Sequence, residues 1–275
     1  MFGYAGKILH VDLTNGTIEI EEPAEELYRT YLGGSALGMY YLLKSTPAGA
    51  DPLGPDNTMA FMLSGVTGAP VAGQSRCTVV AKSPLTGAVG DSQAGGFWPA
   101  ELKFAGFDMI IVEGKAESPV VLSIVDDKIS IQPGLEFWGR TTSETEALFK
   151  KNLTDKWAAR ETYLVSIGPA GENGVKYSGI FSDRRACGRG GGGALMGSKN
   201  LKAVAVRGKK RASVADKSAL IKLAKWGADN LEDSDIAGLS KYGTAETTGA
   251  NHASGTLPTY NYNSGVFEKW EAIDG

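Results

Sequence analysis

Cysteine and histidine are scarce in this 275-residue sequence, which holds only Cys77, Cys187, His10 and His252. Two cysteines cannot build a disulfide framework, so we expect a reducing compartment and a cytoplasmic location. So few histidines leave little acid–base machinery, and no Ser/His/Asp set or structural metal site can be assembled. Neither cysteine has a histidine neighbour to lower its pKa, so both are expected to be buried small hydrophobic residues.

Long apolar runs and an excess of positive charge are also missing. No stretch approaches the roughly 20 apolar residues of a membrane-spanning helix, and the N-terminal Met-Phe-Gly-Tyr lacks the pattern of a signal peptide. The net charge is −3, so neither nucleic acid nor a membrane is an expected partner. Hydrophobic residues make up 42% of the chain, which is enough for the core of an ordinary soluble protein.

Glycine, by contrast, is abundant, with 37 residues, and Gly190 to Gly193 form a continuous run. Backbone without Cβ atoms can approach a ligand closely, and a loop leading into a helix offers N–H groups to an anion. Arg185 and Arg189 add guanidinium forks that suit phosphate. The segment therefore predicts a phosphate-binding corner. A second such corner is expected at residues 90–96 (GDSQAGG), where a glycine turn capping an ordinary helix is the alternative.

The order of the expected elements favours an α+β fold. Residues 7–13 and 17–21 alternate on either side of Asn15-Gly16, which predicts a β-hairpin. The helical stretch 25–44 is interrupted at Gly33-Gly34, so two helices are expected there. Further strands are expected at 59–63, 76–81, 109–113, 120–125, 129–132, 163–167, 176–181 and 203–206, and helices at 100–105 and 144–152. Clustered strands with few intervening helices favour α+β over a regular βαβ alternation.

The two halves of the strand-rich region resemble each other. Each leads through strands to a loop with arginine and glycine, around residues 76–96 and 185–193, which indicates a duplicated unit. Beyond the basic run 207–211 the pattern changes to an amphipathic stretch at 213–231 and then to no strand pattern at all. We therefore expect a first domain at 1–210 and the beginning of a truncated helical domain at 211–275.

The glycine run also admits a dinucleotide interpretation. Gly188-Arg-Gly-Gly-Gly-Gly193 satisfies G-x-G-x-x-G, and the basic run that follows could contact the phosphate of NADP. That motif belongs with the first strand of its fold, however, and here it follows most of the strands. An NADP-binding oxidoreductase domain therefore stands as one competing hypothesis, and a non-catalytic interaction module as another.

Many collinear segments resemble the N-terminal part of the tungsten-containing aldehyde ferredoxin oxidoreductase family. They cover nearly the whole chain and read GKILHVDLTNG (6–16), YLGG (31–34), KSPLTG (82–87), AELKFAG (100–106), VEGKA (112–116), IGPAGEN (167–173), GRGG (188–191), MGSKNLKA (196–203) and KYGTA (241–245). The resemblance implies a first domain of two β-sheets related by a pseudo-twofold axis. Those sheets would form a base for tungstopterin, in which two molybdopterin-type ligands hold tungsten or molybdenum and magnesium bridges their phosphates.

The same resemblance implies which residues contact the pterins. In the family these contacts come from two glycine-containing loops and from an arginine on a strand. The matching residues of this sequence are Arg76, Gln93, Gly95, Arg185, Ala186, Gly188 and Arg189. Position 93 departs from the family pattern, which has asparagine there, and this puts a side-chain role near magnesium in doubt. From the residues alone, Arg76 would be an ordinary surface arginine.

One part of the family pattern is absent from this sequence. The C-x-x-C-x-x-x-C group that holds the family's [4Fe-4S] cluster does not occur in it. The segment after Thr256 is rich in Tyr, Asn and Gly and has no recognisable stop, so we expect a fragment of a longer enzyme. The resemblance implies that the parent enzyme oxidises an aldehyde to a carboxylic acid and passes electrons to ferredoxin, and it leaves a homodimer open. We expect the isolated fragment to be inactive.

Overall fold

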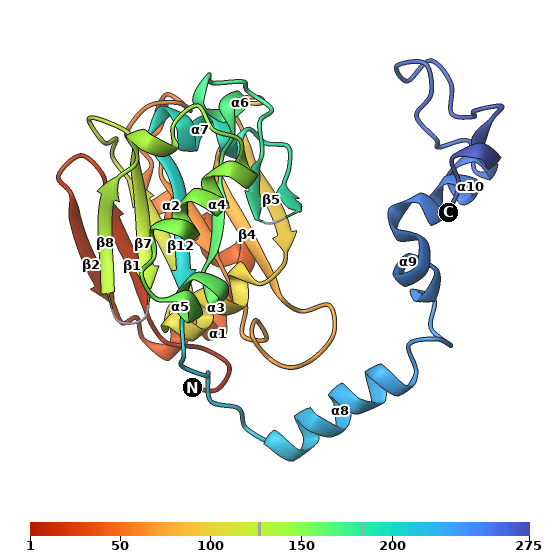
Figure 1. Cartoon of the computed structure of the whole chain (residues 1–275), viewed down its shortest axis with the longest axis horizontal. Coiled ribbons are helices and arrows are strands. Elements are labelled where there is room, and N and C mark those ends of the chain that lie inside the picture. The colour runs from red at the N-terminus through yellow and green to blue at the C-terminus, as the bar shows by residue number, and fades with distance from the viewer. Residues whose placement is uncertain (126–127, 183) are drawn as a thin grey trace. The chain divides into compact units, whose positions relative to one another are not determined.

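The computed structural model describes every residue of the chain except 126, 127 and 183. The described residues divide into two compact units: the first holds Met1–Ala69 and Gly73–Asp216, and the second holds Pro70–Ala72 and Lys217–Gly275. All the strands that the structure describes belong to the first unit, where they form two six-stranded sheets (Figure 1). This arrangement confirms the α+β fold class.

Each sheet follows one order of strands from edge to edge. The first sheet contains, in spatial order, β2 (Thr17–Glu21), β1 (Ile8–Asp12), β6 (Met109–Glu113), β3 (Met59–Met62), β4 (Arg76–Lys82) and β5 (Val89–Gly95). The second contains β8 (Lys128–Pro133), β7 (Val120–Val125), β12 (Leu201–Arg207), β9 (Tyr163–Ser166), β10 (Ile180–Ser182) and β11 (Arg185–Cys187).

The two sheets have the same topology. In each, the first hairpin (β1–β2 or β7–β8) is followed in space by a parallel partner of its first strand (β6 or β12). The three remaining strands are then added antiparallel, in chain order. The duplication indicated by the sequence is therefore present, and β5 and β11 are equivalent edge strands.

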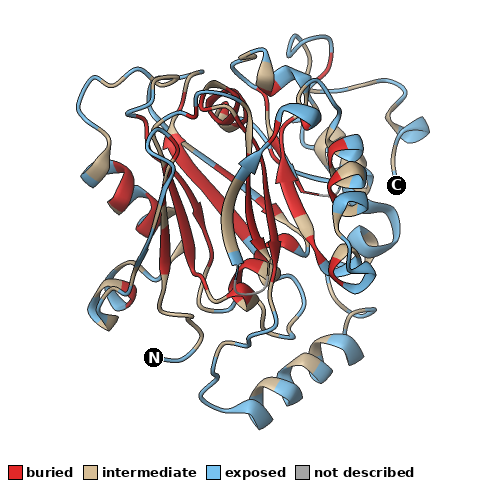
Figure 2. Ribbon diagram, turned by 60° about the vertical axis from the view of Figure 1, so that its left-hand side comes forward, coloured by how far each residue is buried: buried red, intermediate tan, exposed pale blue. Residues whose placement is uncertain are grey.

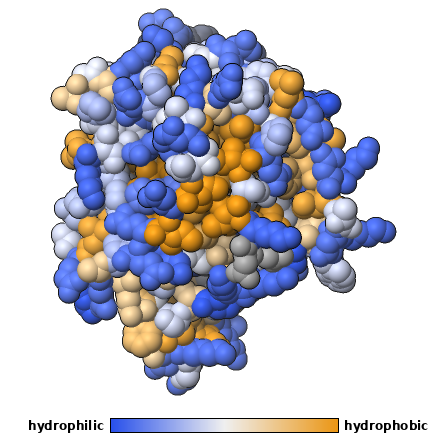
Figure 3. All heavy atoms as spheres, turned by 90° about the vertical axis from the view of Figure 1, so that its left-hand side faces the viewer, coloured by the Kyte–Doolittle hydropathy of each residue, from blue (hydrophilic) through white to orange (hydrophobic). Residues whose placement is uncertain are grey.

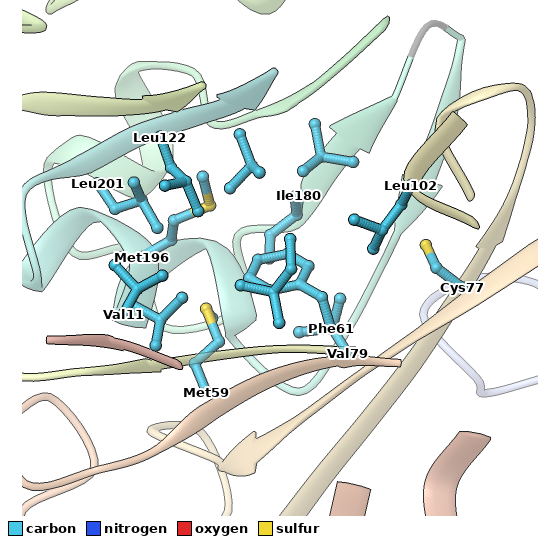
Figure 4. Packing of buried hydrophobic residues seen from close by; sticks show 14 of the residues in the cluster. Val11, Met59, Phe61, Cys77, Val79, Leu102, Leu122, Ile180, Met196 and Leu201 are labelled. Carbon is cyan, nitrogen blue, oxygen red and sulfur yellow. The ribbon is translucent and has the colours of Figure 1, made fainter. Parts of the chain in front are cut away.

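The main core lies between the two sheets. It joins apolar side chains of the first sheet, such as Phe61 and Val79, to those of the second, such as Leu122, and buries them together (Figures 2 and 4). Two helices also contribute to this layer: α3 (Trp98–Ala105) and α7 (Gly192–Ser198). Trp98 is fully buried there, and its indole Nε1 donates to the carbonyl oxygen of Val204 at 2.9 Å. Helix α3 of the first half is thereby fixed to the sheet of the second half.

Helices cover the outer faces of both sheets. On the first sheet, α1 (Glu25–Tyr31) and α2 (Gly34–Ser45) pack against a second apolar cluster. On the second sheet, the cover consists of η1 (Leu135–Phe137) and α4 (Thr142–Asn152). Short helices α5 (Lys156–Glu161) and α6 (Pro169–Glu172) flank β9. At the edges formed by β2 and β8, Ile18, Ile129 and Ile131 are only partly buried, and Figure 3 shows an apolar patch on this side.

Local signals explain several of the helix boundaries. The break expected at Gly33-Gly34 is confirmed: Leu32 has φ of 60° and Gly33 has φ of 117°, and glycine accepts such values most readily. Helix α4 begins with a capping box, in which the Thr141 hydroxyl accepts from the backbone N–H of Glu144 and the Glu144 carboxylate accepts from that of Thr141. These interactions satisfy backbone donors that the first turn leaves unpaired.

Two expectations about the strands were wrong. Residues 89–95 form strand β5 instead of a loop, because their backbone pairs along the full length of β4, from Val89 with Lys82 to Gly95 with Arg76. Conversely, the strand expected at 176–181 begins only at Ile180. The carbonyl oxygen of Ser178 accepts instead from the N–H of Gly193, which holds the preceding residues against helix α7.

The second unit is helical and has little core of its own. It contains the confirmed amphipathic helix α8 (Lys217–Asp229), followed by α9 (Ala237–Tyr242), η2 (Gly243–Glu246), α10 (Thr247–Ala253) and η3 (Trp270–Ala272). No residue of α8 is buried, and Ile221, Leu223 and Trp226 are all more than half exposed. Exposed apolar side chains on an amphipathic helix ordinarily pack against another element.

Candidate functional site

The edge strands β5 and β11 bring the two predicted corners together. Gly90 of β5 lies against Gly190 of the glycine run: a Cβ atom on Gly90 would lie 3.2 Å from the carbonyl oxygen of Gly190, and one on Gly190 would lie 3.4 Å from Cα of Gly90. Residues 90 and 190 come from different halves of the duplicated fold. The duplication therefore brings together in one surface the edge strand β5 and the segment that begins with the edge strand β11.

Two arginines converge on this surface from the two sheets. Arg76 opens β4 and pairs with Gly95 across the strand ladder. A Cβ atom on Gly95 would lie 3.8 Å from Nη1 of Arg76 and 3.7 Å from Cδ of Arg185. A Cβ atom on Gly96 would likewise lie 3.5 Å from Cδ of Arg185. The glycine pair thus leaves a shallow space that is bordered by both guanidinium-bearing side chains.

The other predicted residues lie on the exposed side of the same edge. Gln93 is exposed and shares a strand face with Gly95, two residues further along β5, while Ala186, Gly188 and Arg189 are exposed on β11 and the turn after it. Among the residues that the structure describes, no carboxylate forms an ion pair with Arg76, Arg185 or Arg189. Their charges are therefore available to an anion.

Two glycines of the run, Gly191 and Gly193, are used for packing within the chain. A Cβ atom on Gly191 would overlap the carbonyl oxygen of Lys176, and one on Gly193 would lie 2.5 Å from that of Gly179. The Gly193 N–H is already used, because it donates to Ser178. These two glycines are needed for close packing of the chain on itself. Gly188 differs, since a Cβ atom on it would meet nothing within 4 Å.

Two polar contributors, Ser75 and Ser182, were missed by the sequence analysis. Ser75 donates from its hydroxyl to the carbonyl oxygen of Gly96 at 2.7 Å, and this bond links the residue before β4 to the residue after β5. Ser182 is 2% exposed, and its Oγ has no hydrogen-bond partner in the described part of the chain. A Cβ atom on Gly96 would lie 3.8 Å from that Oγ. In the sequence, only the position of Ser75 beside Arg76 could have indicated a role for either serine at this surface.

The two cysteines lie directly beneath this surface. Both are buried, as expected, and their Sγ atoms are 4.0 Å apart. The hydrogen bond from Cys187, with help from the Arg76 charge, holds the pKa of the Cys77 thiol below its ordinary value, whereas the same interaction and burial raise the pKa of Cys187. His10 lies elsewhere in the first sheet, where its Nε2 hydrogen bonds to Glu21 at 2.7 Å.

The site is an open surface and not an enclosed cleft. The cavity beside Arg189 and Gly190 measures only about 10 Å³, whereas a hollow of about 450 Å³ lies elsewhere, lined by Tyr4, Phe107 and Lys210 among others. Within the described residues, no group of three Asp, Glu, His or Cys side chains could hold a metal ion. Nor does that part of the chain contain a helix both long and apolar enough to cross a membrane.

Comparison with known proteins identifies the family. The model of the family described as "Aldehyde ferredoxin oxidoreductase, N-terminal domain" matches residues 8–208. The chain belongs to the aldehyde ferredoxin oxidoreductase family. The tungsten-containing aldehyde ferredoxin oxidoreductases of Pyrococcus abyssi and Pyrococcus furiosus are 45% and 43% identical over 98% and 97% of the chain. The chain spans 44% of the length of each of these relatives.

More distant relatives extend the likeness. The aliphatic sulfonate oxidoreductase, WOR-like subunit, of Pyrococcus furiosus is 36% identical over 76% of the chain and 35% of its own length. Among solved structures, the BamBC active site complex of benzoyl coenzyme A reductase, bound to 1,5-dienoyl-CoA, superposes with a TM-score of 0.79. It is 36% identical and covers 84% of this chain, which spans 35% of that chain.

The topology of the family fold also counts against the dinucleotide hypothesis. A Rossmann motif needs a glycine turn between two parallel strands of one sheet. Here the glycine run joins β11 to β12 through the short helix α7, and two strands, β10 and β9, lie between them in the sheet. Because each successive pairing is antiparallel, β11 and β12 run in opposite directions.

Proposed function

We propose that this chain is the cofactor-supporting N-terminal domain of a tungsten or molybdenum bis-pterin oxidoreductase. The complete enzyme would oxidise aldehydes to carboxylic acids in the cytoplasm and pass the electrons to ferredoxin or a related carrier. The observation that carries this proposal is the convergence of Arg76 and Arg185, from two equivalent sheets, on the glycine pair Gly95-Gly96. The names of the relatives that are more than 40% identical support the metal and the reaction.

The residues at this surface fit a phosphate-bearing pterin. Guanidinium groups form charge-assisted, forked hydrogen bonds with phosphate, and no described carboxylate pairs with the three arginines of the surface. The space above Gly95-Gly96 is one that Cβ atoms would fill. The buried Ser182 hydroxyl beneath it offers one more donor.

When bound, the tungstopterin would supply the two-electron oxidation of the aldehyde. The part of this chain is to bind and orient: Arg76, Arg185 and Arg189 would neutralise phosphate charge, and exposed Gln93, Ala186 and Gly188 would line the contact. Gly95 would allow close approach of the ligand to β5. Magnesium bridging the phosphates, a [4Fe-4S] cluster held by the remaining length of the enzyme, and a homodimer are further parts of the proposal.

The test measures cofactor retention in the complete enzyme. The enzyme would be expressed anaerobically with tungstate, and its tungsten and pterin content would be compared with that of the Arg76→Ala, Arg185→Ala and Arg189→Ala variants. A charge-assisted hydrogen bond contributes about 1.5–3 kcal/mol, so each loss should weaken retention by roughly ten- to a hundredfold. The folds should stay intact, because all three side chains are exposed.

Arg29→Ala provides the matched control. Arg29 is 77% exposed on α1 and pairs only with Glu25 of the same helix among the described residues, so its loss should leave metal and pterin content unchanged. Unchanged content in the Arg76 and Arg185 variants, with unchanged melting temperature, would refute the proposed site. A complete enzyme that never acquires pterin would favour an interaction module, and tight NADPH binding would favour the dinucleotide hypothesis.

A further inference from the structure

Two thiols from different sheets meet in the core of this domain. Cys77 is the second residue of β4, and Cys187 is the last residue of β11. Each is 1% exposed, and their sulfur atoms lie 4.0 Å apart although 110 positions separate them in sequence. Figure 4 shows the Cys77 side chain pointing into the core near Leu102. Both cysteines are free.

The pair lies within short reach of a covalent bond. A disulfide has sulfur atoms about 2.05 Å apart, so the two sulfurs must approach by about 2 Å. Both cysteines lie on paired strands, Cys77 opposite Ala94 of β5 and Cys187 opposite Ile180 of β10. The approach therefore needs rotation of the two side chains and a small shift at the end of β11, where Cys187 is the last strand residue and is followed by Gly188.

The surroundings also prepare one sulfur for oxidation. The thiolate is the reactive form of cysteine, and a hydrogen bond from Cys187 together with the nearby Arg76 charge lowers the pKa of Cys77. Exposed residues flank both thiols in the chain, Arg76 on one side and Ala186 and Gly188 on the other. Because both cysteines are only 1% exposed, the oxidant must be a small molecule such as hydrogen peroxide, and a bulky disulfide reagent is excluded.

We propose that Cys77 and Cys187 form a peroxide-sensitive site whose oxidation joins the two sheets through an intramolecular disulfide. In the first step the Cys77 thiolate attacks hydrogen peroxide, an S–O bond forms as the O–O bond breaks, and hydroxide leaves. In the second, the Cys187 sulfur attacks the resulting sulfenic acid, the S–S bond forms, and the sulfenic oxygen leaves as water. Overall, two thiols and one peroxide give one disulfide and two waters.

The crosslink would act at the candidate cofactor surface without depending on a bound cofactor. It would tie Arg76, through its neighbour Cys77, to the strand that carries Arg185 and Ala186. The separation between the two arginine-bearing segments would then be fixed by a covalent bond. Closing a loop of this length also removes loop-closure entropy from the unfolded chain, which favours the folded state.

The test uses the reduced 275-residue chain, treated with stoichiometric hydrogen peroxide and then alkylated. We expect both thiols to be lost together in a monomer two hydrogens lighter, and a single peptide that joins Cys77 to Cys187. The oxidised chain should melt about 10 °C higher than the reduced chain. Dithiothreitol should reverse both changes.

Single substitutions separate the pair from independent oxidation. Cys187→Ser should leave Cys77 as a sulfenic acid that reacts with dimedone, and neither Cys187→Ser nor Cys77→Ser should show the rise in melting temperature. If serine disturbs the core, the Cys→Ala variants serve the same purpose, and the peptide map of the unsubstituted chain is decisive without them. Intermolecular disulfides only, or independent oxidation of the two thiols, would overturn the proposal.

Discussion

Replacement of single glycines in the run after β11 should separate packing from ligand approach. Gly191 has φ of 76°, and a Cβ atom on it would overlap the carbonyl oxygen of Lys176 and lie 2.6 Å from Cγ of Pro84. Gly188, three residues earlier, has ordinary backbone and open space around it. We therefore expect opposite results from Gly191→Ala and Gly188→Ala.

The cost of Gly191→Ala has two sources. An L-residue in left-handed backbone costs about 1–2 kcal/mol, and forcing an extra methyl group into a packed site costs about 1–3 kcal/mol. Together they predict a loss of about 2–5 kcal/mol in the free energy of unfolding. For a domain of roughly 200 residues this lowers the melting temperature by about 4–20 °C. Gly188→Ala has neither cost, and its melting temperature should change by no more than about 2 °C.

Thermal unfolding of both variants, followed by circular dichroism, measures the difference. If Gly191→Ala melted within about 2 °C of the unsubstituted chain, the contact with Lys176 would not be rigid and the packing argument would fail. If both variants behave as expected, Gly188→Ala becomes the substitution with which to probe ligand approach. A loss of pterin from a Gly191 variant would report only a damaged fold.

Three further results are expected. Burial lowers the pKa of the fully buried Lys199 from 10.5 to about 8. Between pH 8 and pH 10.5 the folded chain therefore binds fewer protons than the unfolded chain. The free energy of unfolding should rise by about 3 kcal/mol across this pH range. Urea titrations of Lys199→Met should lack that rise, and parallel pH profiles would refute the assignment. The isolated chain should neither reduce viologen with an aldehyde nor hold an iron–sulfur cluster, having two cysteines; aldehyde-dependent viologen reduction would contradict this. Amides of α8, which has no buried residue, should exchange hydrogen much faster than those of the buried strand β12, and equally slow exchange would show that α8 is packed.

Elements with a strong local signal could be predicted from the sequence. The hairpin β1–β2 pairs Asp12 with Thr17 across the Asn15-Gly16 turn, as the alternation and the turn residues indicated. Gly33-Gly34 separates α1 from α2 for an equally local reason, a backbone conformation that glycine adopts easily. In both cases the residues that decide the structure are neighbours in the chain.

Elements that depend on partners distant in the sequence could not be predicted from it. Strand β5 contains small and polar residues with weak strand preference, and it is a strand because β4 pairs with all of it. The roles of the glycines were hidden for the same reason, since only the fold shows that Gly191 faces Lys176 while Gly188 faces open space. The approach of Arg185 to Gly95 likewise needs both sheets in place.

The duplication places two equivalent edge strands at the candidate surface, but the arginines there are not placed symmetrically. Strands β5 and β11 are equivalent, and each is followed by a glycine turn and a short helix in the central layer. The arginines do not follow this equivalence. Arg76 opens β4, whose counterpart β10 opens with Ile180, whereas Arg185 belongs to the edge strand β11 itself. The cations of the candidate surface are therefore arranged asymmetrically although the two sheets are equivalent, and under the proposed function the two pterins would meet different arginine arrangements.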